Sequence, residues 1–119
     1  MSSRDLKNKP LVEASSEITF MPIYISVIKG EEYDLIIDPR LTLIIKRDVD
    51  SPGLLNVTDN SLGIDATSYS RDELIHILEE QIFFLWETYA LEYPDNLTPR
   101  AQQLRNRLLR RIRSVKNAA

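Results

Sequence analysis

The sequence predicts a single α+β domain, in which a small, mostly antiparallel sheet of three to five strands is followed by two C-terminal α-helices. Three observations lead to this prediction. The chain has 119 residues, the size of one domain. Between residues 18 and 66, short runs of β-branched and aromatic residues alternate with turn residues, as strands do. From residue 70 onward, apolar residues recur with the 3.6-residue period of a helix.

The strand region begins at residues 18–28, where ITFMPIYISVI is rich in β-branched and aromatic side chains. Pro22 has no backbone N–H to donate, so this strand should lie at a sheet edge or be bulged at Pro22. Residues 29–32 predict a hairpin turn. Further strands are predicted at residues 33–37, 41–46, 54–57 and 62–66.

The first helix is predicted from residue 70 to about Leu91, before Pro94. Ser70 and Glu73 fit a capping box, in which the Ser70 hydroxyl accepts from the Glu73 amide and the Glu73 side chain reaches back. The face expected to pack on the sheet consists of Leu74, Leu78, Ile82, Leu85 and Tyr89.

The second half of this helix is apolar around almost its whole circumference, at residues 82–86. A sheet covers only one face of a helix, so a second surface must cover the rest, either the last helix or another subunit. The sequence therefore predicts an interface with a second copy or a partner protein. The residues assigned to it are Phe83, Phe84, Trp86 and Leu91.

The last helix is predicted at about residues 98–115, with Thr98 as N-cap and Pro99 at the first helical position. It is rich in arginine, and residues 100–119 carry seven basic residues and no acidic ones. The arginines either cover the acidic body or bind phosphates, which makes nucleic-acid binding the alternative function. The residues assigned to that alternative are Arg100, Arg105, Arg107, Arg110, Arg111 and Arg113.

Composition narrows the classes of function. The absence of cysteine excludes thiol catalysis and Cys-ligated metals. His76, the only histidine, is expected to be solvated beside acidic residues, and neither a catalytic set nor a metal-ligand set can be assembled from the spacing. Residues 1–99 hold 18 acidic and eight basic residues, a net charge of −10. We expect no enzyme activity, no cofactor and no metal.

The N-terminal stretch, residues 1–16, is polar and contains Pro10, so we expect a flexible arm before a single domain at residues 17–119. It lacks the apolar core of a signal peptide, and no apolar run in the chain approaches the roughly 20 residues that a membrane-spanning helix needs. The expected location is the cytoplasm, without membrane contact.

The order of a hairpin, a third strand, a short turn and an acidic capped helix resembles the HicB-like antitoxin family. The stretch that carries this resemblance is residues 62–75, LGIDATSYSRDELI, within a similar region of residues 18–91. The family's Pro-Gly-Cys-like strand motif is absent, and the Arg-rich helix differs from the family's usual repressor domain. The resemblance implies a partial RNase H-like sheet-and-helix fold without nuclease chemistry, a small toxin-like protein partner and an oligomer.

Together these observations predict a non-enzymatic protein-interaction module, antitoxin-like in character. We expect it to form a homo-oligomer, with a dimer favoured, and to bind a small protein partner. Nucleic-acid binding through the Arg-rich helix is the alternative.

Overall fold

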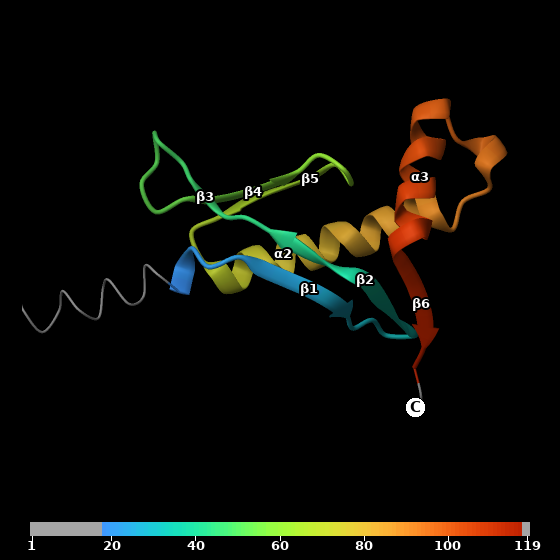
Figure 1. Cartoon of the computed structure of the whole chain (residues 1–119), viewed down its shortest axis with the longest axis horizontal. Helices are drawn as coiled ribbons and strands as arrows, with labels where there is room; N and C mark the ends of the chain where they lie inside the picture. The colour runs from blue at the N-terminus through green and yellow to red at the C-terminus, as the bar shows by residue number, and fades with distance from the viewer. Residues whose placement is uncertain (1–17, 118–119) are drawn as a thin grey trace, which may run out of the picture.

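The structure is a computed structural model that describes residues 18–117 (Figure 1). The predicted flexible arm, residues 1–16, lies outside the described residues. The predicted α+β class is confirmed, with strands first and two helices after them. In chain order the elements are β1 (Ile23–Ile28), β2 (Tyr33–Leu43), β3 (Lys46–Arg47), β4 (Leu55–Asp59), β5 (Ile64–Ser68), α2 (Arg71–Leu85), the π-helical turn η1 (Trp86–Ala90), the 3₁₀ turn η2 (Pro94–Asn96), α3 (Pro99–Arg111) and β6 (Ile112–Lys116).

The strands form two antiparallel sheets of three strands each, with the orders β1-β2-β6 and β3-β4-β5. Each sheet has a strand number within the predicted three to five, but the sequence predicted one sheet and the structure has two. A strand that the sequence did not predict is β6, which follows the last helix and pairs with β2. Both sheets share α2, which lies between them in Figure 1.

The first strand confirms the edge position predicted from Pro22. β1 begins directly after this proline and occupies one edge of its sheet. It is shorter than predicted, because residues 18 and 19 are helical. The irregularity in its pairing lies at Ser26, where the register against β2 shifts between Ile25 and Val27.

The second strand runs through Pro39, where the sequence predicted an interruption. The register explains why: Val27 of β1 faces Ile36, and Ile25 faces Leu41, so residues 37–40 bulge away from β1. A proline costs little there, because no ladder hydrogen bond to β1 is required of it. The carbonyls of Pro39 and Arg40 instead accept hydrogen bonds from the Arg111 guanidinium, at 2.9 and 2.8 Å.

The first helix begins with the predicted N-cap. The Ser70 hydroxyl accepts a hydrogen bond from the Glu73 amide at 3.3 Å. The reverse half of the capping box differs, since the Ser70 amide donates to the Ser68 hydroxyl at 3.2 Å. The helical path continues from α2 through η1 to Ala90, which matches the predicted extent of residues 70–91.

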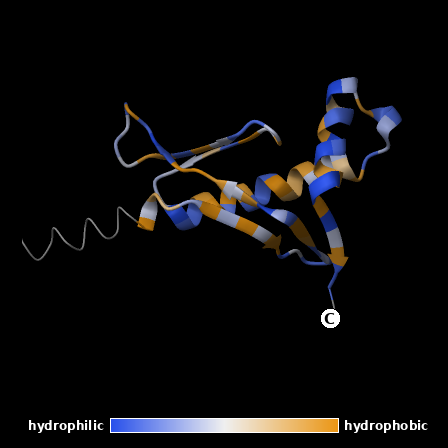
Figure 2. Cartoon of the chain, in the orientation of Figure 1, coloured by the Kyte–Doolittle hydropathy of each residue, from blue (hydrophilic) through white to orange (hydrophobic). Residues whose placement is uncertain are grey.

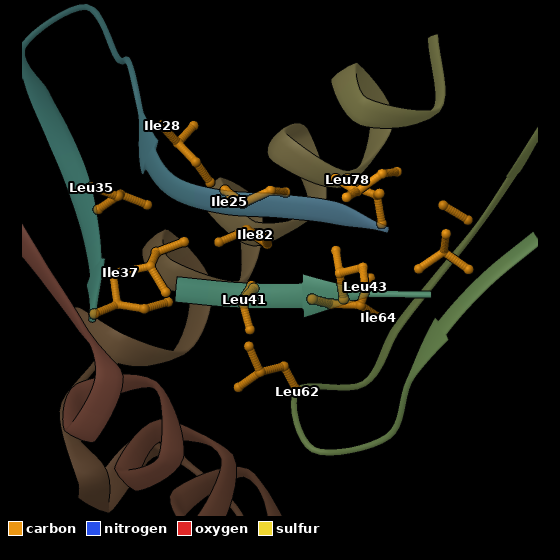
Figure 3. Packing of buried hydrophobic residues seen from close by; sticks show 14 of the residues in the cluster. Ile25, Ile28, Leu35, Ile37, Leu41, Leu43, Leu62, Ile64, Leu78 and Ile82 are labelled. Carbon is orange, nitrogen blue, oxygen red and sulfur yellow. The ribbon is translucent and has the colours of Figure 1, made fainter. Parts of the chain in front are cut away.

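The core lies where α2 meets both sheets. Leu74, Leu78 and Ile82 of α2 are fully buried, as the helical spacing predicted. Figure 3 shows Leu78 and Ile82 packed among residues from β1, β2 and the β4–β5 region. Figure 2 shows the same division along the chain, with apolar residues concentrated in the strands and α2, whereas α3 is mostly hydrophilic. Within residues 18–117, no helix is long and apolar enough to cross a membrane.

The last helix is shorter than predicted. Its start is confirmed, because the Thr98 hydroxyl accepts from the Ala101 amide at 3.2 Å and Pro99 follows. The helix ends at Arg111, and residues 112–116 form β6 against β2. Ile112 and Val115 lie within the predicted helix of residues 98–115, but both are β-branched and suit a strand equally well. β1 pairs with only one side of β2, and the backbone groups on the other side of β2 are available to residues 112–116. These hydrogen-bond partners favour the strand over the helix.

Candidate protein-interaction site

The four residues predicted to form an interface differ in burial. Trp86 is only 4% exposed and belongs to the core, because α3 packs against η1. This side chain therefore needs no partner to cover it. Phe83 is partly buried, and its ring centre lies 5.5 Å from that of Tyr33. Phe84 and Leu91 are 62% and 58% exposed. The described part of the chain thus leaves two of the four uncovered.

Phe84 forms one wall of a shallow groove between α2 and the start of β5. We call this the Phe84 groove; its volume is about 300 Å³ and its lining residues are Gly63, Asp65, Gln81, Phe84 and Leu85. Glu80 and Glu87 are exposed on the same helical segment, about one turn before and one turn after Phe84. An exposed aromatic ring with acidic neighbours fits a protein surface that is apolar at its centre and basic at its rim.

A larger cleft, of about 460 Å³, lies between the β1–β2 turn and α2. Its walls include Tyr33, Phe83 and five glutamates. Burial is the main cause that raises the pKa of Tyr33, and the negative charge of Glu87 adds to it, so the phenol stays neutral at physiological pH. His76 lies at the rim, solvent-exposed as predicted, with its Nε2 atom 2.6 Å from the Glu80 carboxylate.

The chemistry that this acidic cleft offers is limited to charge and aromatic contact. Among residues 18–117, no group of three His, Asp or Glu side chains is arranged to hold a metal ion. Five of its lining residues are glutamates, whose carboxylates repel each other and attract cations. The cleft is therefore an acidic surface beside the β1–β2 turn, and it shares no lining residue with the Phe84 groove.

The β1–β2 turn beside this cleft is held in place by several polar contacts. Asp34 accepts hydrogen bonds from the Lys29 ammonium at 3.0 Å and from the Gly30 amide at 3.2 Å. The Lys29 contact is the main reason that the pKa of Asp34 lies below its usual value. Asn117 donates its side-chain amide to the carbonyls of Gly30 and Glu31, at 3.1 and 2.7 Å. The geometry of the turn is therefore fixed by Asp34 at the start of β2 and by Asn117 directly after β6.

Substitution of Gly30 by alanine is expected to destabilise the protein by about 1–3 kcal/mol, the usual cost of overpacking. An added Cβ would lie 2.3 Å from the Tyr33 carbonyl oxygen and 2.6 Å from Cζ of Phe83, so the backbone or the ring must move. Urea denaturation would measure the loss. Adding Phe83→Leu to Gly30→Ala removes one of the two clashes and should restore part of the stability. A Gly30→Ala variant as stable as the parent would show that the turn is not packed this closely.

The arginines of the C-terminal segment fall into two groups. Arg105, Arg107 and Arg111 are used within the fold. Arg105 donates to the Glu92 carbonyl at 3.0 Å and Arg107 donates to the Ser61 carbonyl at 2.7 Å, while Arg111 holds the β2 bulge. In the described part of the chain, the side chains of the other three arginines assigned to nucleic-acid binding make no hydrogen bond or ion pair. These are Arg100, Arg110 and Arg113, all exposed.

One surface was not predicted from the sequence. A groove of about 360 Å³ follows the outer edge of β1 and is bounded on its other side by α2. We call it the β1 groove; its lining residues are Pro22–Val27, Arg71, Ile75 and Glu79. The signal was present in the sequence, because Pro22 indicated an edge strand and residues 23–28 contain no charge. Only the fold shows that a helix runs beside this edge.

Among residues 18–117, the candidate surfaces for recognition include the Phe84 groove, the acidic cleft, the β1 groove and three exposed arginines. Two other surfaces are covered within the fold, because α3 packs against η1 and β6 pairs with β2. Comparison with protein-family models, with curated proteins and with solved structures finds no match for this chain.

Proposed function

We propose that the protein is a non-enzymatic interaction module that forms a homo-oligomer and binds a second protein at the Phe84 groove. The observation that carries the proposal is the 62% exposure of Phe84 on a helix whose opposite face is fully buried. Aromatic side chains are enriched in protein interfaces compared with the remaining surface. The packing of α2 on the sheets does not require an aromatic residue on the face that points to solvent. A protein-binding surface, in contrast, uses aromatic residues as anchors.

The charge around this groove suggests the chemistry of the partner. Glu80, Glu87 and Asp65 surround or line the site, and residues 1–99 carry a net charge of −10. Complementary charge accelerates association and disfavours wrong partners. A small basic protein that inserts an apolar side chain beside Phe84 fits these properties.

The resemblance of residues 62–75 to HicB-like antitoxins supports a more specific form of the proposal. In this form the chain is an antitoxin and its partner is a small toxin-like protein. The acidic surface is compatible with that assignment, since it would pair with a basic partner. The adjacent open reading frame tests this form directly, because an antitoxin role requires a small toxin-like neighbour.

Phe84→Glu is expected to weaken partner binding by about tenfold or more, because truncation or charging of an interface anchor costs about 2 kcal/mol. The fold should persist, since the side chain is mostly exposed. The partner would be identified by co-purification from the native host, then purified and titrated by calorimetry against the parent and the variant. Circular dichroism would verify the fold.

Tyr69→Glu provides the matched control for this test. Tyr69 is an aromatic residue that is 71% exposed and precedes α2, so it receives the same charge away from the Phe84 groove. It should bind the partner like the parent. Equal affinity of the parent and Phe84→Glu would contradict the assignment of the groove. A protein that recovers no partner from its host would contradict the proposed function itself.

Nucleic-acid binding remains the alternative proposal, supported by the exposed Arg100, Arg110 and Arg113. Phosphate neutralisation releases counterions, so the affinity should fall steeply with salt concentration. Only half of the arginines assigned to this function are uncommitted within the described fold, which makes protein binding the better supported proposal.

A further inference from the structure

The four edges of the two sheets differ in how they are protected against pairing with another strand. Natural proteins protect sheet edges by making them short, by charging them or by covering them. β3 has two residues, Lys46 and Arg47, and is both short and charged. β6 carries Arg113 and Lys116. These two edges therefore resist the addition of a strand.

The edge formed by β5 is covered in another way. The Gln81 side chain from α2 reaches Asp65 and contacts its backbone as a neighbouring strand would. The Gln81 amide donates to the Asp65 carbonyl at 2.6 Å, and the Asp65 amide donates to the Gln81 side-chain carbonyl at 3.2 Å. Both backbone groups at this point of the edge are thereby satisfied.

Within residues 18–117, the edge formed by β1 has none of these protections along Ile23–Ile28, although Arg71 covers the carbonyls just before it. Its six residues, IYISVI, include no charge and no proline, and five of them are β-branched or aromatic. In the part of the chain that the structure describes, β1 pairs with β2 alone and its other side borders the β1 groove. Tyr24 and Val27 are 52% and 41% exposed. This edge has the properties of a strand that pairs with a further strand.

The charges that flank the β1 groove show which strand fits it. Arg71 lies at the Pro22 end, where its guanidinium donates to the carbonyls of Met21 and Pro22 at 2.6 and 3.1 Å. Glu79 lies two helical turns further along α2 and also lines the acidic cleft beside Ile28, so it lies toward the other end of the groove. The groove therefore has a positive end and a negative end.

We propose that β1 pairs antiparallel with β1 of a second copy of this chain, which joins two three-stranded sheets into one continuous six-stranded sheet. A two-fold axis perpendicular to the sheet reverses the second groove, so Arg71 of each copy approaches Glu79 of the other. The helices α2 then lie side by side on one face of the joined sheet. This inference deepens the proposed function by naming the surface through which the homo-oligomer forms, and it uses a different surface from partner binding.

Pairing of β1 with β6 of another copy is the main competing arrangement. It would bring Arg113 and Lys116 to the edge and repeat head to tail, so that each added copy leaves another edge open. The antiparallel pairing of two β1 strands instead leaves no β1 edge uncovered and closes at a dimer. The pairing of two β1 strands has complementary charges and closes at two copies. It is therefore favoured over the pairing of β1 with β6.

Cysteine crosslinking tests which strand lies at the β1 edge. The chain has no cysteine, so an introduced thiol is the only one that reacts. Ser26 and Ser114 are exposed serines near the middle of β1 and β6, which makes them a matched pair. A short thiol-to-thiol crosslinker should link two copies of the full-length Ser26→Cys protein, because the two-fold axis passes close to the middle of β1. It should leave the Ser114→Cys protein monomeric on a denaturing gel.

A second pair of variants measures the strength of the contact. Val27 and Val115 are 41% and 39% exposed and lie on the two edge strands of one sheet. Val27→Lys places a positive charge near Arg71 of the second copy, so the dimer dissociation constant should rise by about tenfold or more. Val115→Lys should leave it unchanged within about twofold. Light scattering and sedimentation over a range of protein concentrations would give both constants, and circular dichroism would confirm that both variants fold.

Three results would overturn the inference: a parent protein that stays monomeric at all concentrations, a crosslink formed by Ser114→Cys in place of Ser26→Cys, or a dimer that Val27→Lys leaves intact. Phe84→Glu separates this inference from the proposed function. It should weaken partner binding by about tenfold or more and leave the dimer intact. Dissociation of the dimer by Phe84→Glu but not by Val27→Lys would move self-association to the Phe84 groove and overturn the pairing of β1.

Discussion

Replacement of Leu78 by aspartate is expected to lower the free energy of unfolding by about 3 kcal/mol or more. Leu78 is fully buried on α2, in the centre of the region where the helix meets both sheets. Its surroundings in the core are aliphatic side chains, so a carboxylate there has no cation to pair with (Figure 3). Urea denaturation monitored by circular dichroism would measure the loss.

Phe84→Glu serves as the control for this prediction, because it introduces the same charge on the same helix at a position that is 62% exposed. Surface substitutions of this kind usually change stability by no more than about 0.5 kcal/mol. A clear difference between the two variants would show that the cost arises from burial of charge and not from a change in helix propensity. An unchanged melting temperature for Leu78→Asp would contradict the placement of α2 in the core.

The elements that the sequence predicted well are those specified by neighbouring residues. The Ser70 cap and the spacing of Leu74, Leu78 and Ile82 are local patterns, and both are present as predicted. The same holds for Thr98 and Pro99 at the start of α3. A helix start and its buried face depend on residues one turn apart, so a single sequence contains the information needed to place them.

The features that were missed depend on partners distant in sequence. Ile112 fits a helical stripe and a strand equally well, and only the unpaired side of β2, more than 70 residues earlier, selects the strand. Trp86 was assigned to an interface because no local pattern shows that α3 folds back over η1. Arg111 likewise belongs to a basic face in the sequence, whereas in the fold it holds the carbonyls of the β2 bulge.

The candidate site was predicted in part for the same reason. Exposure of Phe84 follows from its position opposite the buried stripe, which the helical period gives. The β1 groove needs two elements to meet, an uncharged edge strand and a helix that begins more than 40 residues later. Residue spacing within β1 contains no information about that helix, so the groove is visible only in the fold.

Leu108→Ala is expected to lower the free energy of unfolding by about 2–5 kcal/mol, because it removes a fully buried side chain and leaves a cavity. Leu108 is the one fully buried residue of α3, the helix that packs against η1 and covers Trp86. Its neighbour Leu109 is 43% exposed, so Leu109→Ala should change stability by no more than about 0.5 kcal/mol. Urea denaturation followed by tryptophan fluorescence would measure both, since Trp86 is the only tryptophan in the chain. Similar losses for the two variants would mean that α3 is not docked by Leu108, and Trp86 would then again require a partner to cover it.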